Sequence, residues 1–145
     1  MVDVVGDPVG LVQSRSEFRM AASHLARCAC GSLSVSCNGE PVSVSLCHCL
    51  ACQRRTGSIY GIAAFFSRNR IDVTGPHSDF IRPSDSGHDV TFHFCPRCGS
   101  TVFWEPARKP DLVAVAVGCF AESSFQRPGK SVYQQHRHNW VRDMS

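Results

Sequence analysis

The chain has 145 residues, of which 43% are hydrophobic and 19% are charged, and its formal net charge is +3. This length suits one domain, or one domain with an arm, and the composition is that of a globular protein rather than a disordered one. No apolar run approaches the roughly 20 residues of a membrane span, and the basic residues are scattered rather than gathered in one stripe, so neither a membrane nor a nucleic acid is expected as a partner.

Residues 1–22 are predicted to be an N-terminal arm, and residues 23–145 are predicted to form one domain. The first residues include Asp3 and Asp7 and have no basic stretch before an apolar one, so no secretory signal is expected. Within the arm and just after it, EFRMAASHLA (17–26) is compatible with a short helical turn.

From residue 32 onward the pattern is typical of short β-strands. Residues 32–37 and 41–46 alternate apolar and polar side chains on either side of an Asn-Gly turn signal, which predicts a hairpin. Further strands are predicted at residues 58–67, 70–75, 89–94, 101–104 and 112–120. Because the strands are short, the turns frequent and long helical periods missing, the chain is expected to be a mainly β, mostly antiparallel domain.

Nine cysteines are the unusual feature of the composition. An odd count argues against a closed disulfide framework, and the expected compartment is reducing, namely the cytoplasm, where clustered thiols are more often metal ligands. Seven of the nine lie in three groups, in the motifs CACG, CHCLAC and CPRCGS. The other two, Cys37 and Cys119, stand apart and are interpreted as small buried apolar residues.

The first and third groups together supply four thiols, here named the cysteine quartet: Cys28, Cys30, Cys95 and Cys98. Both groups run into a glycine, Gly31 or Gly99, which suits the tight turn of a metal-binding knuckle. If the two knuckles meet, they form a closed four-thiolate zinc site that contributes directly to folding.

The middle group, here named the cysteine trio, consists of Cys47, Cys49 and Cys52. Three protein ligands with an exchangeable fourth position are the pattern of a catalytic zinc site. Zinc with three thiolates already carries a net negative charge, and a fourth thiolate would double it. Arg54 and Arg55 follow closely, and we expect them to compensate this charge and to bind the carboxylates of an anionic thiol.

Two alternatives remain open at this point. His48 or His93 could complete the trio as a fourth ligand, although His48 alternates out of phase with the neighbouring cysteines. Independently of that, the whole chain could be a zinc-stabilised binding module without catalysis, in which all metal is structural.

CACG, CHCLACQRRTGS and FCPRCGS, in this order, resemble the glutathione-dependent formaldehyde-activating enzymes, the family that also contains the centromere protein V domain. The resemblance covers roughly residues 24–120. It implies a β-tent fold, in which twisted antiparallel sheets are built around zinc knuckles. It also implies two zinc ions per chain, a structural one in the quartet and a reactive one in the trio.

The same resemblance implies an activity of the carbon–sulfur lyase class, similar to S-(hydroxymethyl)glutathione synthase. Glutathione would be the thiol co-substrate, and formaldehyde or another small aldehyde would be its partner. Relatives carry a histidine and an aromatic residue near the end of the domain, so His138 and Trp140 are expected to correspond to them, with Trp140 covering the site.

Overall fold

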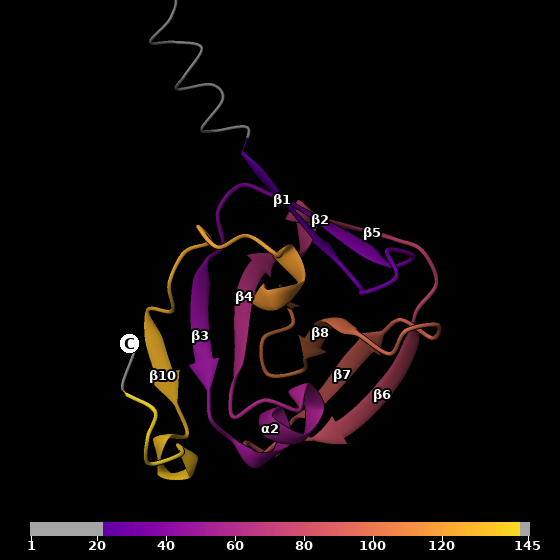
Figure 1. Cartoon of the computed structure of the whole chain (residues 1–145). Helices are drawn as coiled ribbons and strands as arrows, with labels where there is room; N and C mark the ends of the chain where they lie inside the picture. Colours follow the sequence, from indigo (N-terminus) through magenta and orange to yellow (C-terminus); the bar gives the residue numbers. More distant parts are fainter. Residues whose placement is uncertain (1–21, 143–145) are drawn as a thin grey trace, which may run out of the picture.

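The structure of the protein, a computed structural model, describes residues 22–142. Within this range ten strands form two sheets, and helices are few and short (Figure 1). The prediction of a mainly β fold is therefore confirmed. The predicted N-terminal arm, apart from residue 22, and the last three residues of the predicted domain lie outside the described residues.

The smaller sheet has the strand order β1–β2–β5, and both of its pairings are antiparallel. Its strands are β1 (Ser23–Arg27), β2 (Ser34–Asn38) and β5 (Ile71–Thr74). In β2, Val35 and Cys37 are fully buried while Ser34 and Ser36 are partly exposed, as the alternation predicts.

The larger sheet has the strand order β10–β3–β4–β9–β8–β7–β6. Its strands are β3 (Ser43–Cys47), β4 (Gly61–Ser67), β6 (Ser78–Pro83), β7 (Asp89–Phe94), β8 (Thr101–Pro106), β9 (Leu112–Ala116) and β10 (Lys130–Val132). All neighbours pair antiparallel except β10 and β3, which are parallel. Edge strand β6 and the last strand, β10, were not predicted.

The main core lies where the two sheets face each other. It combines Leu33 and Val35 from the smaller sheet's side with Phe66 and Val115 from the larger sheet, and Phe120 closes it. Burying a side chain of this size contributes roughly 1.5–3 kcal/mol. The two sheets are therefore held together by shared apolar burial as well as by the chain connections between them.

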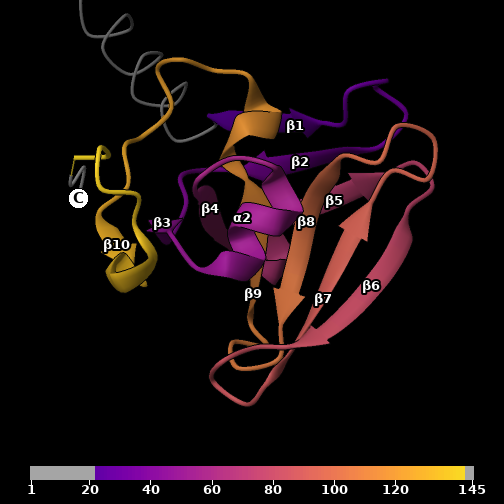
Figure 2. The ribbon, with the colours of Figure 1, turned by 60° about the horizontal axis from the view of Figure 1, so that its bottom comes forward.

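The helix α2 (Leu50–Thr56) begins directly after the second cysteine of the trio. It lies over the larger sheet, beside β4 (Figure 2). The described residues also include three short 3₁₀ helices, at Arg68–Arg70, Val117–Phe120 and Gln134–His136. None of the helices in the described range is long and apolar enough to cross a membrane.

The predicted hairpin of residues 32–37 and 41–46 is wrong. Strand β2 pairs with β1 and β5, whereas β3 pairs with β4 and β10, so the Asn-Gly stretch connects two sheets. The alternation showed correctly which side of β2 is buried. The alternation of apolar and polar residues does not identify the strand with which β2 pairs, and a turn signal alone does not identify it either.

Other local features also differ from the predictions. Residues 23–26, expected in a helical turn, belong to strand β1, because pairing with β2 decides the conformation of this short stretch. The helix α2 at residues 50–56 was not predicted. The predicted strand at 112–120 ends at Ala116 and continues as a 3₁₀ helix.

Candidate functional site

The structure brings the cysteine quartet together from two distant segments. Cys28 and Cys30 follow β1, and Cys95 and Cys98 lie in the turn between β7 and β8. The Sγ atom of Cys30 is 3.6 Å from Sγ of Cys28 and 3.6 Å from Sγ of Cys95. Zn–S bonds of about 2.3 Å at tetrahedral angles place sulfurs about 3.8 Å apart, so this donor set fits zinc.

Backbone amides in the quartet point at sulfur. The N–H of Leu33 donates to Sγ of Cys28 over 3.2 Å, and the N–H of Cys98 is directed at Sγ of Cys95 over 3.5 Å. Amide donors favour the charged thiolate over the neutral thiol. The loops are therefore folded to receive sulfur as a thiolate, the form in which it binds metal.

The two glycines that follow the quartet motifs have positive φ, 81° at Gly31 and 78° at Gly99, as a knuckle turn requires. Two serines missed by the sequence analysis also contact the sulfurs. The Ser32 hydroxyl is 3.0 Å from Sγ of Cys30, and the Ser100 hydroxyl is 3.4 Å from Sγ of Cys98. The hydrogen bond with Ser100 is the main cause that lowers the pKa of Cys98 to about 5.

The cysteine trio is assembled within one short segment. Cys47 ends strand β3, Cys49 is the N-cap residue of α2, and Cys52 lies in the first turn of the helix. The three Sγ atoms lie within 4.8 Å of one another, and the N–H of Cys52 donates to Sγ of Cys49 over 3.3 Å. The trio therefore contains one knuckle of the same kind as the quartet.

The trio is poised to carry negative charge on sulfur. The hydrogen bond with Cys47 is the largest cause that lowers the pKa of Cys52 to about 5; Cys49 and the Arg55 guanidinium act in the same direction, and burial opposes them. The same hydrogen bond, together with burial, raises the pKa of Cys47. The Arg55 guanidinium and the close sulfurs thus favour a thiolate at Cys52.

Neither candidate for a fourth ligand joins the trio. The Nε2 atom of His48 is 3.0 Å from the hydroxyl of Ser131, and His93 lies between Asp79 and Glu105 on another part of the sheet. In residues 22–142, no histidine or carboxylate belongs to the group formed by the three thiols. The structure thus contradicts the alternative in which a histidine completes the set.

Arg55 reaches from α2 toward Cys52 and across the sheet. Its guanidinium lies over the Trp104 ring at 4.3 Å from the centroid, a distance suited to a cation–π contact. Gly61, the strand partner of Cys47, leaves the necessary room: a Cβ at this position would be only 2.9 Å from Nη2 of Arg55. Arg54, the other predicted arginine, is exposed.

Beside α2 lies a pocket of about 560 Å³. Its charged and aromatic lining comprises Arg54, Arg55, Arg82, Phe80, Phe92 and Phe94. The trio itself does not line this pocket, but Arg55 lines it and also acts on Cys52. Arg55 is therefore the link between the sulfur cluster and the pocket. Arg82 and the phenylalanines were not found from the sequence because strands distant in the chain bring them to α2.

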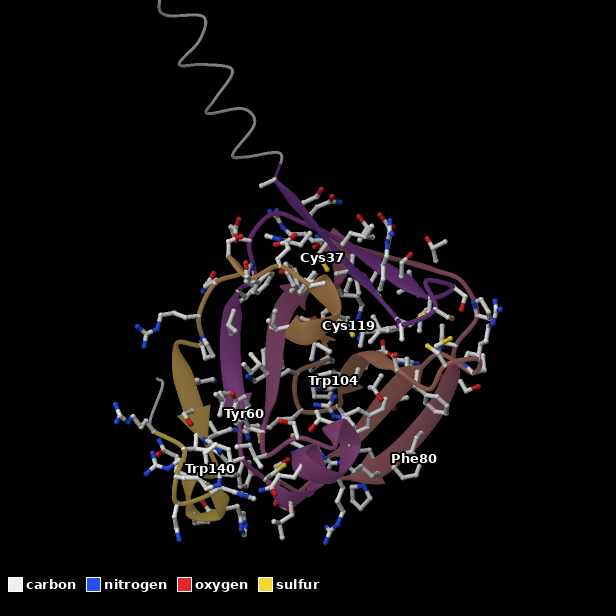
Figure 3. The ribbon with its side chains drawn as sticks, in the orientation of Figure 1. Cys37, Tyr60, Phe80, Trp104, Cys119 and Trp140 are labelled. Atoms are coloured by element: carbon white, nitrogen blue, oxygen red, sulfur yellow. The ribbon has the colours of Figure 1, made fainter. Side chains whose placement is uncertain are left out.

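Trp140 lies on the other side of α2 from Phe80 (Figure 3). Its side chain is 74% exposed and lines a cavity of about 410 Å³ together with Tyr60. The nearby His138 is 3.2 Å from Oε1 of Gln53 in α2, so the C-terminal segment is attached to the helix that carries Cys52. Trp140 is thus placed near the helix but outside the arginine-lined pocket.

The two isolated cysteines differ from each other. Cys37 is fully buried in the main core, and burial raises its pKa to about 12, which confirms its interpretation as a small apolar residue. Cys119 is half-buried, so its interpretation as buried is only partly correct. Both are labelled in Figure 3, away from α2.

The family model described as glutathione-dependent formaldehyde-activating enzyme matches residues 23–136. The crystal structure of a Rhodobacter sphaeroides protein, a structural genomics target, is similar in fold, with a TM-score of 0.52 at 20% identity, over 70% of this chain and 90% of that chain. The comparison with curated proteins found no match. Because the family model spans most of the sequence, the chain belongs to the glutathione-dependent formaldehyde-activating enzyme family.

Proposed function

We propose that the protein adds glutathione, or a similar anionic thiol, to formaldehyde or another small aldehyde, at a zinc ion held by Cys47, Cys49 and Cys52. A second zinc ion, held by the quartet, would be structural. The observation that carries this proposal is the unequal grouping of the thiols: four converge at one place and three at another, without a further ligand among the described residues.

Three thiols in one segment fit a metal that keeps one coordination position for an outside ligand. When bound there, zinc would supply a Lewis-acidic position that favours the thiolate form of an incoming thiol. The residues around the trio would also favour a bound thiolate. The Arg55 guanidinium, already close enough to lower the pKa of Cys52, offsets the negative charge that a further thiolate brings.

The proposed reaction is an addition in which no atom is lost. The thiol sulfur forms a bond to the aldehyde carbon, the carbon–oxygen double bond becomes a single bond, and the proton released from sulfur ends on the oxygen. Thiols and formaldehyde combine without a catalyst, so the protein's contribution would be positioning and charge compensation. Positioning would depend on the residues that bind the remote groups of the thiol compound, those away from its sulfur.

The arginine-lined pocket suits those remote groups. Glutathione carries two carboxylates, and guanidinium groups bind carboxylates through paired hydrogen bonds. Arg54, Arg55 and Arg82 line the same pocket, whose remaining walls include three phenylalanines, and its volume of about 560 Å³ accommodates a tripeptide. We assign Arg54 and Arg55 to carboxylate binding and add Arg82 to them.

We also assign Trp140 a covering role, as the resemblance implies. Its exposed indole and its neighbour His138 stand edge to face, with ring centroids 6.3 Å apart, and His138 contacts Gln53 of α2. A bound thiol that extends past α2 would find an apolar surface there. The assignment predicts that Trp140 fluorescence changes when glutathione binds.

Cobalt substitution tests the proposed function. Replacing zinc by Co²⁺ should give two tetrahedral thiolate sites, and glutathione should change the sulfur-to-cobalt absorption of one of them. In Cys49→Ser, a serine keeps the N-cap of α2 but removes the thiolate, so the fold and the quartet spectrum should persist while the glutathione response is lost.

Cys119→Ser, which alters a cysteine outside both clusters, is the matched control and should behave like the native protein. A native protein whose cobalt spectrum ignores glutathione would favour the binding module and overturn the proposal.

A further inference from the structure

A third group of metal-type ligands contains no cysteine. His77, just before strand β6, Asp79 in β6 and His93 in β7 have ligand atoms within 4.8 Å of one another. The Nδ1 atoms of both histidines point at the same atom, Oδ1 of Asp79, at 3.1 Å from His77 and 2.6 Å from His93. We propose that these three residues form a binding site for a divalent first-row transition-metal ion.

The sheet itself fixes the arrangement. Asp79 and His93 are direct partners in the antiparallel pair β6–β7, and His93 is in turn the partner of Phe103 in β8. Direct antiparallel partners project their side chains from the same face and within contact distance. Two of the three ligands are therefore positioned by backbone register rather than by flexible loops.

Aromatic packing holds both imidazole rings. The ring of His93 stacks on Phe103 with centroids 4.4 Å apart, and His77 meets the same phenylalanine edge-on at 5.4 Å. The side chain of His93 is 7% exposed, whereas those of His77 and Asp79 are 32% and 53% exposed. An ion could thus enter from solvent, bind to one buried and two accessible ligands, and keep coordination positions for water.

The second nitrogen of His93 supports this reading. Its Nε2 atom is 2.7 Å from Oε2 of Glu105, and Glu105 is held by an ion pair with Arg68. Metal-binding histidines usually donate their other ring N–H to a carboxylate, which fixes the tautomer and directs the free lone pair to the metal. With Nε2–H donated to Glu105, Nδ1 of His93 is the nitrogen left for an ion, which would replace the hydrogen that Nδ1 donates to Oδ1 of Asp79.

The donor set defines the class of ion. Two imidazole nitrogens and one carboxylate oxygen suit Zn²⁺ or Fe²⁺ in an open coordination shell, and disfavour Ca²⁺ or Mg²⁺, which prefer oxygen ligands. Phe80 follows Asp79 in β6, Phe92 precedes His93 in β7, and both phenylalanines line the arginine pocket, so Asp79 and His93 project from the opposite face. The site does not rest on the proposed catalytic function.

A competing explanation accounts for the same contacts without metal. A protonated His93 could donate from both nitrogens, to Asp79 and to Glu105, as an ion-paired network that only stabilises the sheet. The two explanations predict different behaviour: the metal site would bind a cation through His77, Asp79 and His93, whereas the network, which His77 also joins through Asp79, would bind none.

The test titrates Co²⁺ into the full chain after its cysteine clusters have been loaded with zinc. One equivalent should bind with weak visible bands of nitrogen and oxygen ligation and without sulfur-to-cobalt absorption, and it should broaden the ring NMR signals of His77 and His93. Exchange into the trio would be recognised by the sulfur band, so the two events are separable.

His77→Asn should weaken this binding at least tenfold, since one of three ligands is lost. Exposed His88, in the loop between β6 and β7, supplies the matched control: His88→Asn should bind Co²⁺ as the native protein does. Glu105→Gln should weaken binding by about 10- to 100-fold, the usual effect of removing a carboxylate that supports a ligating histidine.

The proposal would be overturned if the native protein and His77→Asn bound Co²⁺ equally well. It would also be overturned if every Co²⁺ ion that bound showed the sulfur-to-cobalt band. The Asp79–His93–Glu105 contacts would then be an ion-paired network. Because His77 is partly exposed and lies outside the strands, its replacement tests the ligand without depending on the fold.

Discussion

The quartet and the trio contain the same local element but are completed differently by the chain. In both, a Cys-x-x-Cys turn directs the N–H of its last residue at the sulfur of its first, over 3.5 Å from Cys98 to Cys95 and 3.3 Å from Cys52 to Cys49. The quartet adds two sulfurs from a segment that begins 67 residues earlier, at Cys28, whereas the trio adds only Cys47, from the strand just before.

This difference in where the sulfurs come from predicts different roles for the two clusters, one in stabilising the fold and one in binding a substrate. A metal ion in the quartet would tie the loop after β1 to the turn between β7 and β8, so its binding free energy would become folding free energy. A metal ion in the trio would join residues that are already neighbours, so losing it would cost the fold little. Under the proposed function, the site that would matter less for folding is the one proposed to exchange its ligand.

Removing a quartet sulfur should have the largest effect. Cys98→Ser is expected to lose the structural ion and to unfold far below the native melting temperature, since structural zinc contributes on the order of 10 kcal/mol in small zinc-binding peptides. Thermal unfolding together with zinc content would measure this. Cys49→Ser should shift the melting temperature much less. Equal losses in the two variants would contradict the division into a structural and an exchangeable site.

A smaller effect on the quartet is expected from a residue that carries no ligand. Gly75 has φ of 100°, and a Cβ there would lie 1.9 Å from the carbonyl oxygen of Ser32, whose hydroxyl contacts quartet sulfurs. Gly75→Ala should therefore displace the quartet loop, cost about 3 kcal/mol or more, and make the zinc easier to chelate.

Gly87 provides a matched comparison for Gly75, because its φ is 81° but a Cβ there would meet nothing within 4 Å. Gly87→Ala should cost only the backbone strain, about 1 kcal/mol, and leave zinc release unchanged. Chelation kinetics that do not distinguish the two variants would show that contact with Ser32 does not support the quartet.

The sequence predicted what depends on spacing and composition. Cysteine spacing and the following glycines gave both sulfur groupings, and strand β7 was predicted with its observed bounds, 89–94, because alternation and flanking turns agreed there. The positive φ at Gly31 and Gly99 followed from the same reasoning. These features are local, and local physical chemistry is sufficient to specify them.

What the sequence could not give depends on which distant segments meet. The false hairpin at 32–46, the pairing of β10 with β3, and the position of Arg82 opposite α2 all result from strand order, which alternation does not encode. The convergence of His77, Asp79 and His93 has the same origin. Register across β6 and β7 brings the last two together, although 14 residues separate them.

The smallest effect on stability is expected at the trio, from Gly61→Ala. A Cβ at Gly61 would lie 2.9 Å from Nη2 of Arg55 and 3.6 Å from Cβ of Cys52. Because the closer atom ends a flexible side chain, Arg55 should move aside at little cost to the fold. The displaced guanidinium should then hold the thiol less well, raising KM for glutathione about tenfold, or about 1.4 kcal/mol.

Gly129→Ala is the control for Gly61→Ala, since a Cβ at Gly129 would meet nothing within 4 Å and its φ is not positive. Both variants should keep the native melting temperature and the quartet zinc, while only Gly61→Ala changes KM. A Gly61→Ala protein with native KM would mean that the position of Arg55 beside Cys52 is irrelevant to thiol binding. A large loss of stability would mean instead that Arg55 is fixed by its contact with Trp104 and cannot yield.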